Sequence, residues 1–427
     1  MKKKYWYRLD NSAMVYPMVI TLGTQSLFQL GAELNSNVNS NYLKIALNTA
    51  LERFPYYKVE LKNGLFRHYL DENTHFPIVK KYNGNLLQII NFRPNKNYLF
   101  RLSYYENKIF LDLFHGLCDA NGGIEFLKTI IFYYFQLQHI KISPDNIYTL
   151  DKSISPEEME DAFLKYYKPF KFFEGTKKMA GGTAYKIPGK QFYFSGLGLI
   201  QGTIPTQKLL DLAHLYNCTL TVFVSALLLY SVAKTNKNTK NKENFVAFIP
   251  INLRKFYPSV TMSNFTIFAK CVVPYNTPLE LANFIEIIKD NMRNQLKEDE
   301  LSIKLSYTSL FDKLVFLRFM PLIFKGFISR VGRNFPGKSK QTMIISNIGR
   351  VKIDLEGDNI NKFNFALNTN HKSPKNIGIV SYKDNTVISF SRKVVNTEVE
   401  KEFFRTLANF GLDVSISSNL REECNVL

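Results

Sequence analysis

The chain has 427 residues, 45% of them hydrophobic, and a formal net charge of +19. This length exceeds what one hydrophobic core usually holds, so we expect two domains of about 200 residues each. Much of the positive charge is lysine mixed with asparagine, as in residues 234–244, which is typical of a solvated loop. No zinc-finger spacing, aromatic nucleic-acid motif or basic helix accompanies this charge, so we expect no nucleic-acid partner.

The first part of the chain predicts a mixed α/β domain. Apolar periodicity predicts a helix over 43–51, and β-rich segments follow through 66–70. Residues 98–105 and 108–114 alternate as two strands, and the short polar connection between them predicts a β-hairpin. Behind this hairpin, apolar residues recur at helical spacing from Ile124 to about Leu137.

A polar, turn-rich region then predicts the passage between the domains. Ser143-Pro-Asp opens it, and Ser155-Pro-Glu-Glu158 is typical of a helix start. Ala180-Gly-Gly predicts a further loop. We therefore divide the chain into an N-terminal domain, 1–180, and a C-terminal domain, 181–427.

The second part predicts another α/β unit, in which strands and helices alternate. The predicted strands are 191–201, 245–251, 265–273, 342–346, 363–369 and 387–391. The predicted helices are 205–216, 219–234, 278–296 and 398–410. The fold class we predict is α/β with mixed sheets.

The spacing of the cysteines and the composition of the N-terminus limit which sites and which cellular compartment we expect. The four cysteines, Cys118, Cys218, Cys271 and Cys424, are far apart and form no Cys-x-x-Cys pair. This spacing predicts neither a metal site nor a disulfide framework, and it favours a reducing interior. Polar residues interrupt the basic N-terminus, so no secretory signal is expected, and we predict a cytoplasmic protein.

No stretch approaches about eighteen uninterrupted apolar residues, so we expect no membrane-spanning helix. The nearest segment is 314–331, which mixes strong apolarity with Arg318, Lys325 and Arg330. We expect a buried helix pair bent at Pro321, with peripheral membrane contact as the alternative.

The most informative pattern is His115-x-x-x-Asp119, which follows the second strand of the hairpin. A rigid strand presents the imidazole, and a neutral imidazole can remove the proton from an attacking hydroxyl or amine. Gly122 and Gly123 follow and predict close backbone approach or a positive φ before the helix. Cys118 lies within the motif, where we expect packing rather than a nucleophile.

The motif and two later segments together resemble the chloramphenicol-acetyltransferase-like acyltransferases. Residues 249–259 with Ser263-Asn-Phe265 are similar to one family segment, and Ile345-Ser-Asn-Ile-Gly349 is similar to another. Alcohol acetyltransferases, polyketide-associated acyltransferases and condensation domains are the nearest groups. The resemblance implies two similar domains with an active-site channel between them.

The resemblance also implies roles for individual residues. His115 is the general base, and Asp119 is a structural carboxylate turned toward an arginine, for which Arg254 is the preferred partner in a bidentate pair. Asn264, Ser346 and Asn347 are candidate donors to the oxyanion of a tetrahedral intermediate. Gly122 and Gly123 are expected to be structural, and no metal is expected.

These roles predict an acyltransferase that moves an acyl group from acyl-coenzyme A to an alcohol hydroxyl, with coenzyme A as co-substrate rather than bound cofactor. One alternative is a condensation-like or polyketide-associated enzyme whose donor is a phosphopantetheine arm on an acyl carrier protein; an amine acceptor also remains open. Another alternative is a catalytically inactive binding protein, because Phe114 and Ala120 stand where many members have histidine and glycine.

Overall fold

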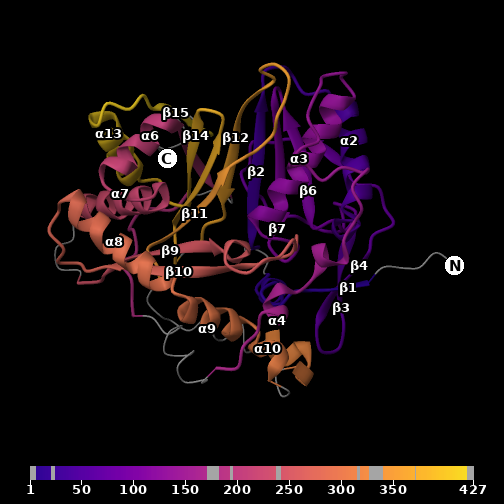
Figure 1. The fold of residues 1–427 in the computed structure, drawn as a ribbon, viewed down its shortest axis with the longest axis horizontal. Helices are drawn as coiled ribbons and strands as arrows, with labels where there is room; N and C mark the ends of the chain where they lie inside the picture. The colour runs from indigo at the N-terminus through magenta and orange to yellow at the C-terminus, as the bar shows by residue number, and fades with distance from the viewer. Residues whose placement is uncertain are drawn as a thin grey trace.

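The structure is a computed structural model, and it describes residues 6–20, 25–170, 182–192, 196–236, 242–314, 318–326, 340–370 and 372–420 (Figure 1). Five sequence predictions fall wholly or partly outside these residues. They are the boundary between 180 and 181, residues 193–195 of the strand predicted at 191–201, residues 237–241 of the lysine-rich loop, Cys424, and residues 315–317 and 327–331 of the apolar segment.

A five-stranded sheet with the order β12-β2-β7-β6-β5 forms the centre of the first half. Its strands are β2 (Leu27–Leu34), β5 (Val79–Lys81), β6 (Phe100–Tyr105), β7 (Lys108–Phe114) and β12 (Ile360–Leu367). Helices α2 (Ser40–Arg53) and α3 (Ala120–Gln136) lie together on the side of this sheet that faces away from the second half (Figure 1). A small sheet, β1-β4-β3, extends this half; its strands are β1 (Trp6–Arg8), β3 (Val59–Asn63) and β4 (His68–Glu72).

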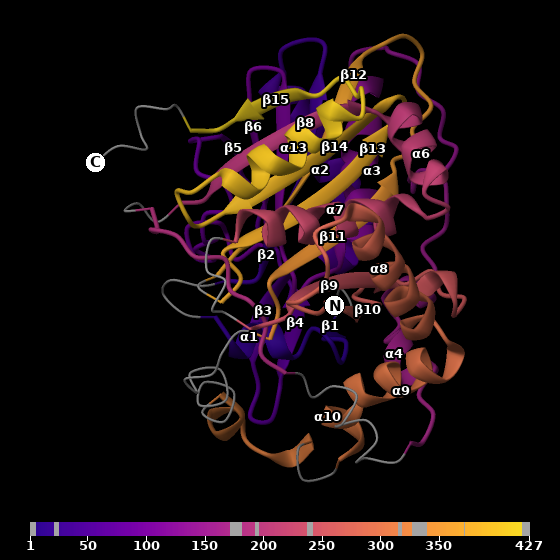
Figure 2. The ribbon, with the colours of Figure 1, turned by 90° about the vertical axis from the view of Figure 1, so that its left-hand side faces the viewer.

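A seven-stranded sheet with the order β10-β9-β11-β13-β14-β8-β15 forms the second half. Its strands are β8 (Gly198–Pro205), β9 (Phe245–Asn252), β10 (Thr266–Val273), β11 (Met343–Arg350), β13 (Lys375–Tyr382), β14 (Asn385–Arg392) and β15 (Ser415–Ser418). Helices α6 (Thr206–Leu215), α7 (Leu220–Thr235), α8 (Leu281–Gln295) and α13 (Glu398–Asn409) cover its outer face (Figure 2). Helix α7 is buried around most of its circumference, which explains why its sequence is apolar on nearly all sides.

Short helices complete the described structure. They are α1 (Val15–Met18), η1 (Pro55–Tyr57), η2 (Pro156–Met159), α4 (Ala162–Lys165), η3 (Leu253–Lys255), α9 (Glu298–Thr308) and α10 (Leu310–Lys313). In the described part of the chain, no single helix is long and apolar enough to cross a bilayer; α6 and α7 reach that length and apolarity only when joined across their 81° bend.

The two halves are joined by chain exchange, and a buried ion pair anchors the passage between them to the first half. Strand β12 comes from the second half of the sequence, yet it pairs antiparallel with β2 in the first sheet. In the passage between the halves, Ser155 and Glu158 form the capping box of η2, as the sequence predicts. The Glu158 carboxylate also accepts hydrogen bonds from both terminal nitrogens of Arg53 at 2.8 Å and from the Tyr56 hydroxyl at 2.6 Å. Removing one partner of such a buried pair typically costs about 3–5 kcal/mol.

The sequence predicts several elements closely, including the buried helix α7, which was expected at 219–234. Strand β7 has the predicted bounds, and the predicted helix at 124–137 is α3, which begins at Ala120. The strand predicted at 191–201 is β8, which lies later at Gly198–Pro205. Strands β2 and β13 were not predicted. Nearly every residue of these strands is buried, so neither shows the alternation that marks a half-exposed strand.

The prediction of a buried helix pair in 314–331 is wrong for the described residues. Phe319, Ile323 and Phe324 are 57%, 81% and 60% exposed. This segment contacts the first half through an edge-on packing of Phe319 against Phe66, with ring centroids 6.0 Å apart, and through hydrogen bonds from the Leu322 N–H and Lys325 Nζ to the carbonyls of Leu65 and Phe66. High apolarity alone did not distinguish a core helix from one that lies on the surface.

Candidate functional site

His115 lies directly after β7 and is held from three sides. Its backbone N–H donates to the Ser26 carbonyl at 2.9 Å, which continues the pairing of β7 with the start of β2. The imidazole stacks on the Tyr16 ring, with centroids 4.9 Å apart and planes 21° apart, and meets the edge of Phe28. These contacts leave the imidazole a single packed orientation.

Asn264 determines which imidazole nitrogen carries the proton. Its Oδ1 lies 3.1 Å from His115 Nδ1, while its Nδ2 donates to Asp10 Oδ2 and to the His115 carbonyl, both at 3.0 Å. Two acceptors around Nδ2 fix the orientation of this amide, because turning it over would place its oxygen against a carboxylate and a carbonyl. An amide oxygen only accepts, so His115 Nδ1 carries the hydrogen and Nε2 keeps a free lone pair.

The environment of the imidazole favours its neutral form. Burial lowers the pKa of His115 below its usual 6.5, and the Asn264 contact, the Asp119 charge and a hydrogen bond to the backbone of His115 itself oppose this shift in part. A buried imidazole with a lowered pKa is uncharged at neutral pH. His115 therefore has both the tautomer and the charge state of a proton acceptor.

Asp119 faces away from the imidazole and is fully occupied. Its Oδ1 caps α3 by accepting the N–H groups of Asn121 and Gly122, and its Oδ2 accepts Arg254 Nη1 at 2.8 Å and the Phe265 N–H at 2.9 Å. The expected partnership with Arg254 is present, but through one carboxylate oxygen rather than as a bidentate pair. The remaining guanidinium donors are engaged by the carbonyls of Thr261 and Ser263 and by Asn252 Oδ1.

Gly122 and Gly123 lie inside the first turn of α3, not at a positive φ. A Cβ on Gly122 would lie 2.2 Å from the Met262 carbonyl oxygen, and one on Gly123 would lie 2.6 Å from the Leu113 side chain. Of the two expectations for this pair, close approach is confirmed. The second half of the molecule can therefore pack directly on the backbone that follows His115.

A cavity of about 380 Å³ opens beside the imidazole, between the two halves. We call it the histidine cavity; its walls include His115, Tyr16, Phe28, Ser346, Asn347 and Phe365. Asn347 Nδ2 donates to Thr221 Oγ1, and its Oδ1 accepts the N–H of Gly349, which has a φ of +81°. The structure thus brings His115, Ser346 and Asn347 to one cavity, while both Nδ2 hydrogens of Asn264 are already committed.

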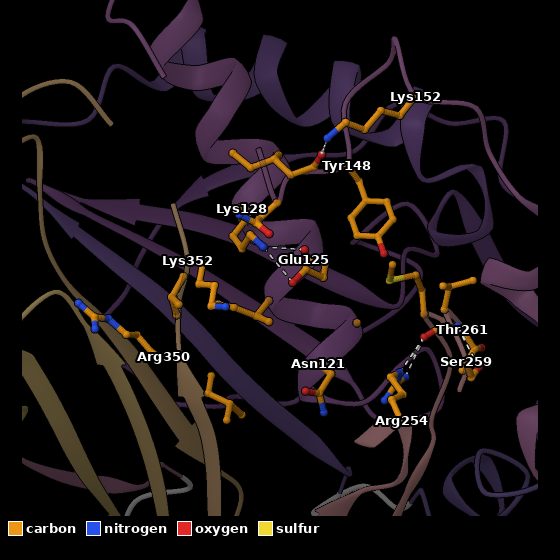
Figure 3. A pocket seen from close by; sticks show the side chains of 18 residues that line it. Asn121, Glu125, Lys128, Tyr148, Lys152, Arg254, Ser259, Thr261, Arg350 and Lys352 are labelled. Carbon is orange, nitrogen blue, oxygen red and sulfur yellow. Dashed lines mark hydrogen bonds and ion pairs between the residues drawn. The ribbon is translucent and has the colours of Figure 1, made fainter. Parts of the chain in front are cut away.

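A second cavity, of about 540 Å³, borders the first. We call it the basic cavity; its described walls include Lys128, Lys152, Arg254, Arg350 and Lys352, with Glu125 as their acid. Figure 3 shows these side chains arranged around the opening, some from α3 and the loops behind it, others from the end of β11 and the loop after β9. Asn121 and Ile348 line both cavities.

The cations of the basic cavity differ in how far they are committed. Lys128 pairs with Glu125 at 2.8 Å, and Lys152 donates to the carbonyls of Pro144 and Ile147. Arg254 holds Asp119. Arg350 and Lys352 are exposed at the end of β11 and beyond it, and no ion pair within the described chain involves them. These two side chains are placed to meet a negatively charged ligand.

Other chemistry has less support in the described residues. No group of three or more His, Cys, Asp or Glu side chains there could hold a metal ion. Burial raises the pKa of the Cys118 thiol well above its usual range, so the thiol stays protonated. A protonated, buried thiol is a poor nucleophile, which agrees with the packing role expected from the sequence.

Sequence reasoning missed four residues. Tyr16, Arg350 and Lys352 line these cavities, and Asp10 binds Asn264 behind the imidazole. Asp10 and Tyr16 lie more than ninety positions before His115, in a segment whose sequence shows no motif that points to a site. Arg350 directly follows the Ile345–Gly349 segment and could have been noted as a cation beside a predicted site.

Comparison with known proteins shows the fold. No protein family model and no curated protein sequence matches the chain. Among solved structures, TRI3 trichothecene 15-O-acetyltransferase from Fusarium sporotrichioides is similar at 11% identity and a TM-score of 0.61, with 95% of this chain and 94% of that chain covered. The first condensation domain of the CDA synthetase is similar at 11% identity and a TM-score of 0.61, covering 95% and 96%. F. sporotrichioides TRI101, complexed with coenzyme A and T-2, is similar at 10% identity and a TM-score of 0.61, covering 97% and 100%.

These similarities cover nearly the whole of each chain, so they concern the full two-part architecture. The protein has the chloramphenicol-acetyltransferase-like fold, and the predicted α/β class with two facing halves is confirmed. At such low sequence identity the likeness establishes the fold and leaves the reaction to be argued from the site.

Proposed function

We propose that the protein is an acyltransferase that moves an acyl group from acyl-coenzyme A to an alcohol hydroxyl, with His115 as general base. The observation that carries this proposal is the contact of His115 Nδ1 with Asn264 Oδ1, which leaves Nε2 unprotonated in a buried, neutral imidazole at the wall of a cavity. A positioned base of this kind typically contributes about 10²- to 10⁴-fold in rate.

In the proposed reaction the acceptor hydroxyl oxygen attacks the thioester carbonyl, and its proton passes to His115 Nε2. The tetrahedral intermediate then collapses, the carbon–sulfur bond breaks, and the proton is delivered to the departing thiolate. The products are an ester and free coenzyme A, so atoms and charge balance without a metal ion or a redox partner. Asp119 and Arg254 would act by holding the loop that carries His115, because they contact each other and not the imidazole nitrogens.

The developing oxyanion needs a hydrogen-bond donor in the histidine cavity. The Ser346 hydroxyl is our preferred donor, because no described hydrogen bond engages it. In contrast, one hydrogen of Asn347 Nδ2 is bound to Thr221, and both hydrogens of Asn264 Nδ2 are bound to Asp10 and His115. A preorganised donor at this position is typically worth on the order of 10²-fold in rate.

The basic cavity supports a phosphate-bearing donor. Coenzyme A carries a diphosphate and a further phosphate, and Arg350 and Lys352 lie where such groups could be paired. Because Asn121 and Ile348 line both cavities, a donor held in the basic cavity has a short path for its pantetheine arm to His115. The acceptor would then occupy the histidine cavity. The size of the basic cavity and the number of its cations favour a nucleotide over the single phosphodiester of a carrier-bound arm.

The test is a screen of the purified protein with acyl-coenzyme A donors of graded chain length and with alcohol and amine acceptors, followed by His115→Ala. We expect ester formation that falls at least about 10²-fold in the variant, with its melting temperature retained. Full activity in a folded His115→Ala protein would reject the mechanism. Transfer from a loaded carrier protein but not from acyl-coenzyme A would replace the donor with a carrier-bound one, and binding without turnover of any donor would favour an inactive binding protein.

A further inference from the structure

Asp10 is a buried carboxylate in the described N-terminal segment, only 5% exposed, and its contacts point toward the candidate site. Its Oδ2 accepts the backbone N–H of Asn264 at 3.1 Å and Asn264 Nδ2 at 3.0 Å. Its Oδ1 accepts the Ala13 N–H at 2.7 Å, which fixes the turn that leads into α1. Asp10 therefore holds Asn264 by both its backbone and its side chain.

Asn264 passes this constraint to His115. Because the Asp10 carboxylate takes an Nδ2 hydrogen, the amide oxygen must point the other way, and it lies 3.1 Å from His115 Nδ1. The second Nδ2 hydrogen binds the His115 carbonyl at 3.0 Å, so the amide contacts both the ring and the backbone of the histidine. Asp10 does not contact His115 in any described hydrogen bond and acts on it only through this amide.

We propose that Asp10 is a positioning residue that, through Asn264, holds His115 in the tautomer with hydrogen on Nδ1 and a free lone pair on Nε2. The catalytic meaning of this inference rests on the proposed function, but the tautomer itself is a property of the protein without substrate. Asp10 lies 105 positions before His115 and 254 before Asn264, so only the folded chain brings the three together.

The surroundings of Asp10 make its charge sensitive to pH. Burial, and after it the nearby Asp161 carboxylate, raise the pKa of Asp10 to about 7, although the hydrogen bonds from Asn264 and Ala13 act in the opposite direction. Asp161 caps α4 and accepts two hydrogen bonds from Asn11. The other titratable groups that interact with Asp10 are the Tyr16 hydroxyl on α1 and the Cys118 thiol in the His115 loop, and burial keeps both protonated.

The direction of the pH effect follows from these contacts. Only the ionised carboxylate can accept all three hydrogen bonds without presenting a hydrogen of its own, so protonation loosens the hold on Asn264. The ionised fraction of Asp10 grows as pH rises through about 7. His115 also becomes neutral as pH rises, but it does so at a lower pH than the ionisation of Asp10, because the pKa of His115 lies below 6.5. The rate should therefore rise in two steps, the upper one belonging to Asp10.

The test reads the His115 imidazole by nitrogen NMR on the substrate-free protein labelled at histidine, with His115→Gln to assign its signals. At pH 8 we expect the wild type to show mainly the Nδ1–H tautomer. An asparagine at position 10 has only one accepting oxygen, so its NH₂ group must face either the Ala13 N–H or the donors of Asn264. Asp10→Asn should therefore weaken the hold on the Asn264 amide, and we expect a mixture of the two His115 tautomers. An unchanged Nδ1–H signal in folded Asp10→Asn would overturn the proposal.

A titration of the wild type covers the case in which Asp10→Asn does not fold. We expect the Nδ1–H fraction of neutral His115 to fall as pH drops through about 7. Asp161→Asn is the matched variant, because it removes the neighbouring negative charge and leaves every Asp10 hydrogen bond in place; it should move this midpoint to lower pH. A tautomer fraction that does not change near pH 7 in either protein would contradict the role given to Asp10.

Turnover provides an independent readout. We expect Asp10→Asn to lower kcat about ten- to a hundredfold, as a slight displacement of a catalytic group does, and to change KM by less than about twofold. Its pH profile should lose the step near 7 and keep the one below 6.5. If no thioester is turned over but the tautomer still depends on Asp10, the proposed function fails and the positioning role stands.

Discussion

The histidine cavity and the basic cavity share Asn121 and Ile348 but differ sharply in charge. The histidine cavity has one lysine and one aspartate among its described walls, and that aspartate is already paired. The basic cavity has five cations and one acid. Keeping the cations in a separate cavity has a chemical advantage. Cations can bind a phosphate, but next to the imidazole they would disturb the reaction of the hydroxyl with the thioester carbonyl at His115.

The wall between the cavities is built from both halves of the molecule. Asp119 lines the histidine cavity and Arg254 lines the basic cavity, and their 2.8 Å ion pair crosses from one to the other. Asn252 Nδ2 donates to Asn121 Oδ1 at 2.9 Å along the same boundary. We therefore expect substitutions in the histidine cavity and in the basic cavity to change different kinetic constants. Loss of the ion pair between them should affect the stability of the whole site.

The largest expected effect is on the wall itself. Arg254→Ala leaves the buried Asp119 carboxylate without its cation and frees the Thr261 and Ser263 carbonyls, so we expect a loss of about 3 kcal/mol in the free energy of unfolding. Urea denaturation measures it. Lys383→Ala, which breaks an exposed pair with Asp358, is the matched control and should cost less than about 0.5 kcal/mol. Equal losses of unfolding free energy in the two variants would mean that the Asp119–Arg254 pair stabilises the protein no more than an exposed ion pair does.

The next effect concerns the histidine cavity alone. Ser346→Ala removes the hydroxyl that we assign to the oxyanion, so kcat should fall on the order of 10²-fold while KM for the donor stays within about twofold. Steady-state kinetics with saturating acyl-coenzyme A give both values. Thr266→Ala alters another hydroxyl at the same cavity and serves as control. A Ser346→Ala protein with normal kcat would assign the oxyanion contact elsewhere.

A smaller effect separates the basic cavity from the reaction. The double variant Arg350→Ala/Lys352→Ala removes its two exposed cations, and we expect about a tenfold increase in KM for acyl-coenzyme A with kcat changed less than twofold. Lys255→Ala, at the histidine cavity, should leave this KM unchanged. Direct binding of coenzyme A by calorimetry checks the same point without turnover, and equal affinity in the wild type and the double variant would move the donor out of the basic cavity.

The smallest effect is that of salt. Exposed charges are screened over about 10 Å at 0.1 M ionic strength, so KM for acyl-coenzyme A should rise a few-fold between about 0.05 and 0.3 M salt. KM for a neutral alcohol in the histidine cavity should stay constant over the same range. Kinetics in sodium chloride measure both. If KM for the alcohol rose as much as KM for acyl-coenzyme A, the charge difference between the cavities would not explain the salt effect.

The sequence by itself determined the local part of this site. Strand β7 alternates, a short polar turn precedes it, and an aspartate precedes an apolar periodic helix, so the hairpin, His115 at its end and the Asp119 cap of α3 follow from interactions within about thirty residues. The partner Arg254 was also named from sequence, through the resemblance of its segment rather than through any local signal.

Only the tertiary structure decided how distant groups share their hydrogen bonds. Asn264 was one of three equivalent oxyanion candidates until the fold placed Asp10 on one side of its amide and His115 on the other. The Asp119–Arg254 contact uses one oxygen because the fold gives the other to α3, and β12 completes the sheet of the other half. Local sequence fixes caps and periodicity, whereas a buried polar group takes whichever partners the packed chain brings within about 3 Å of it.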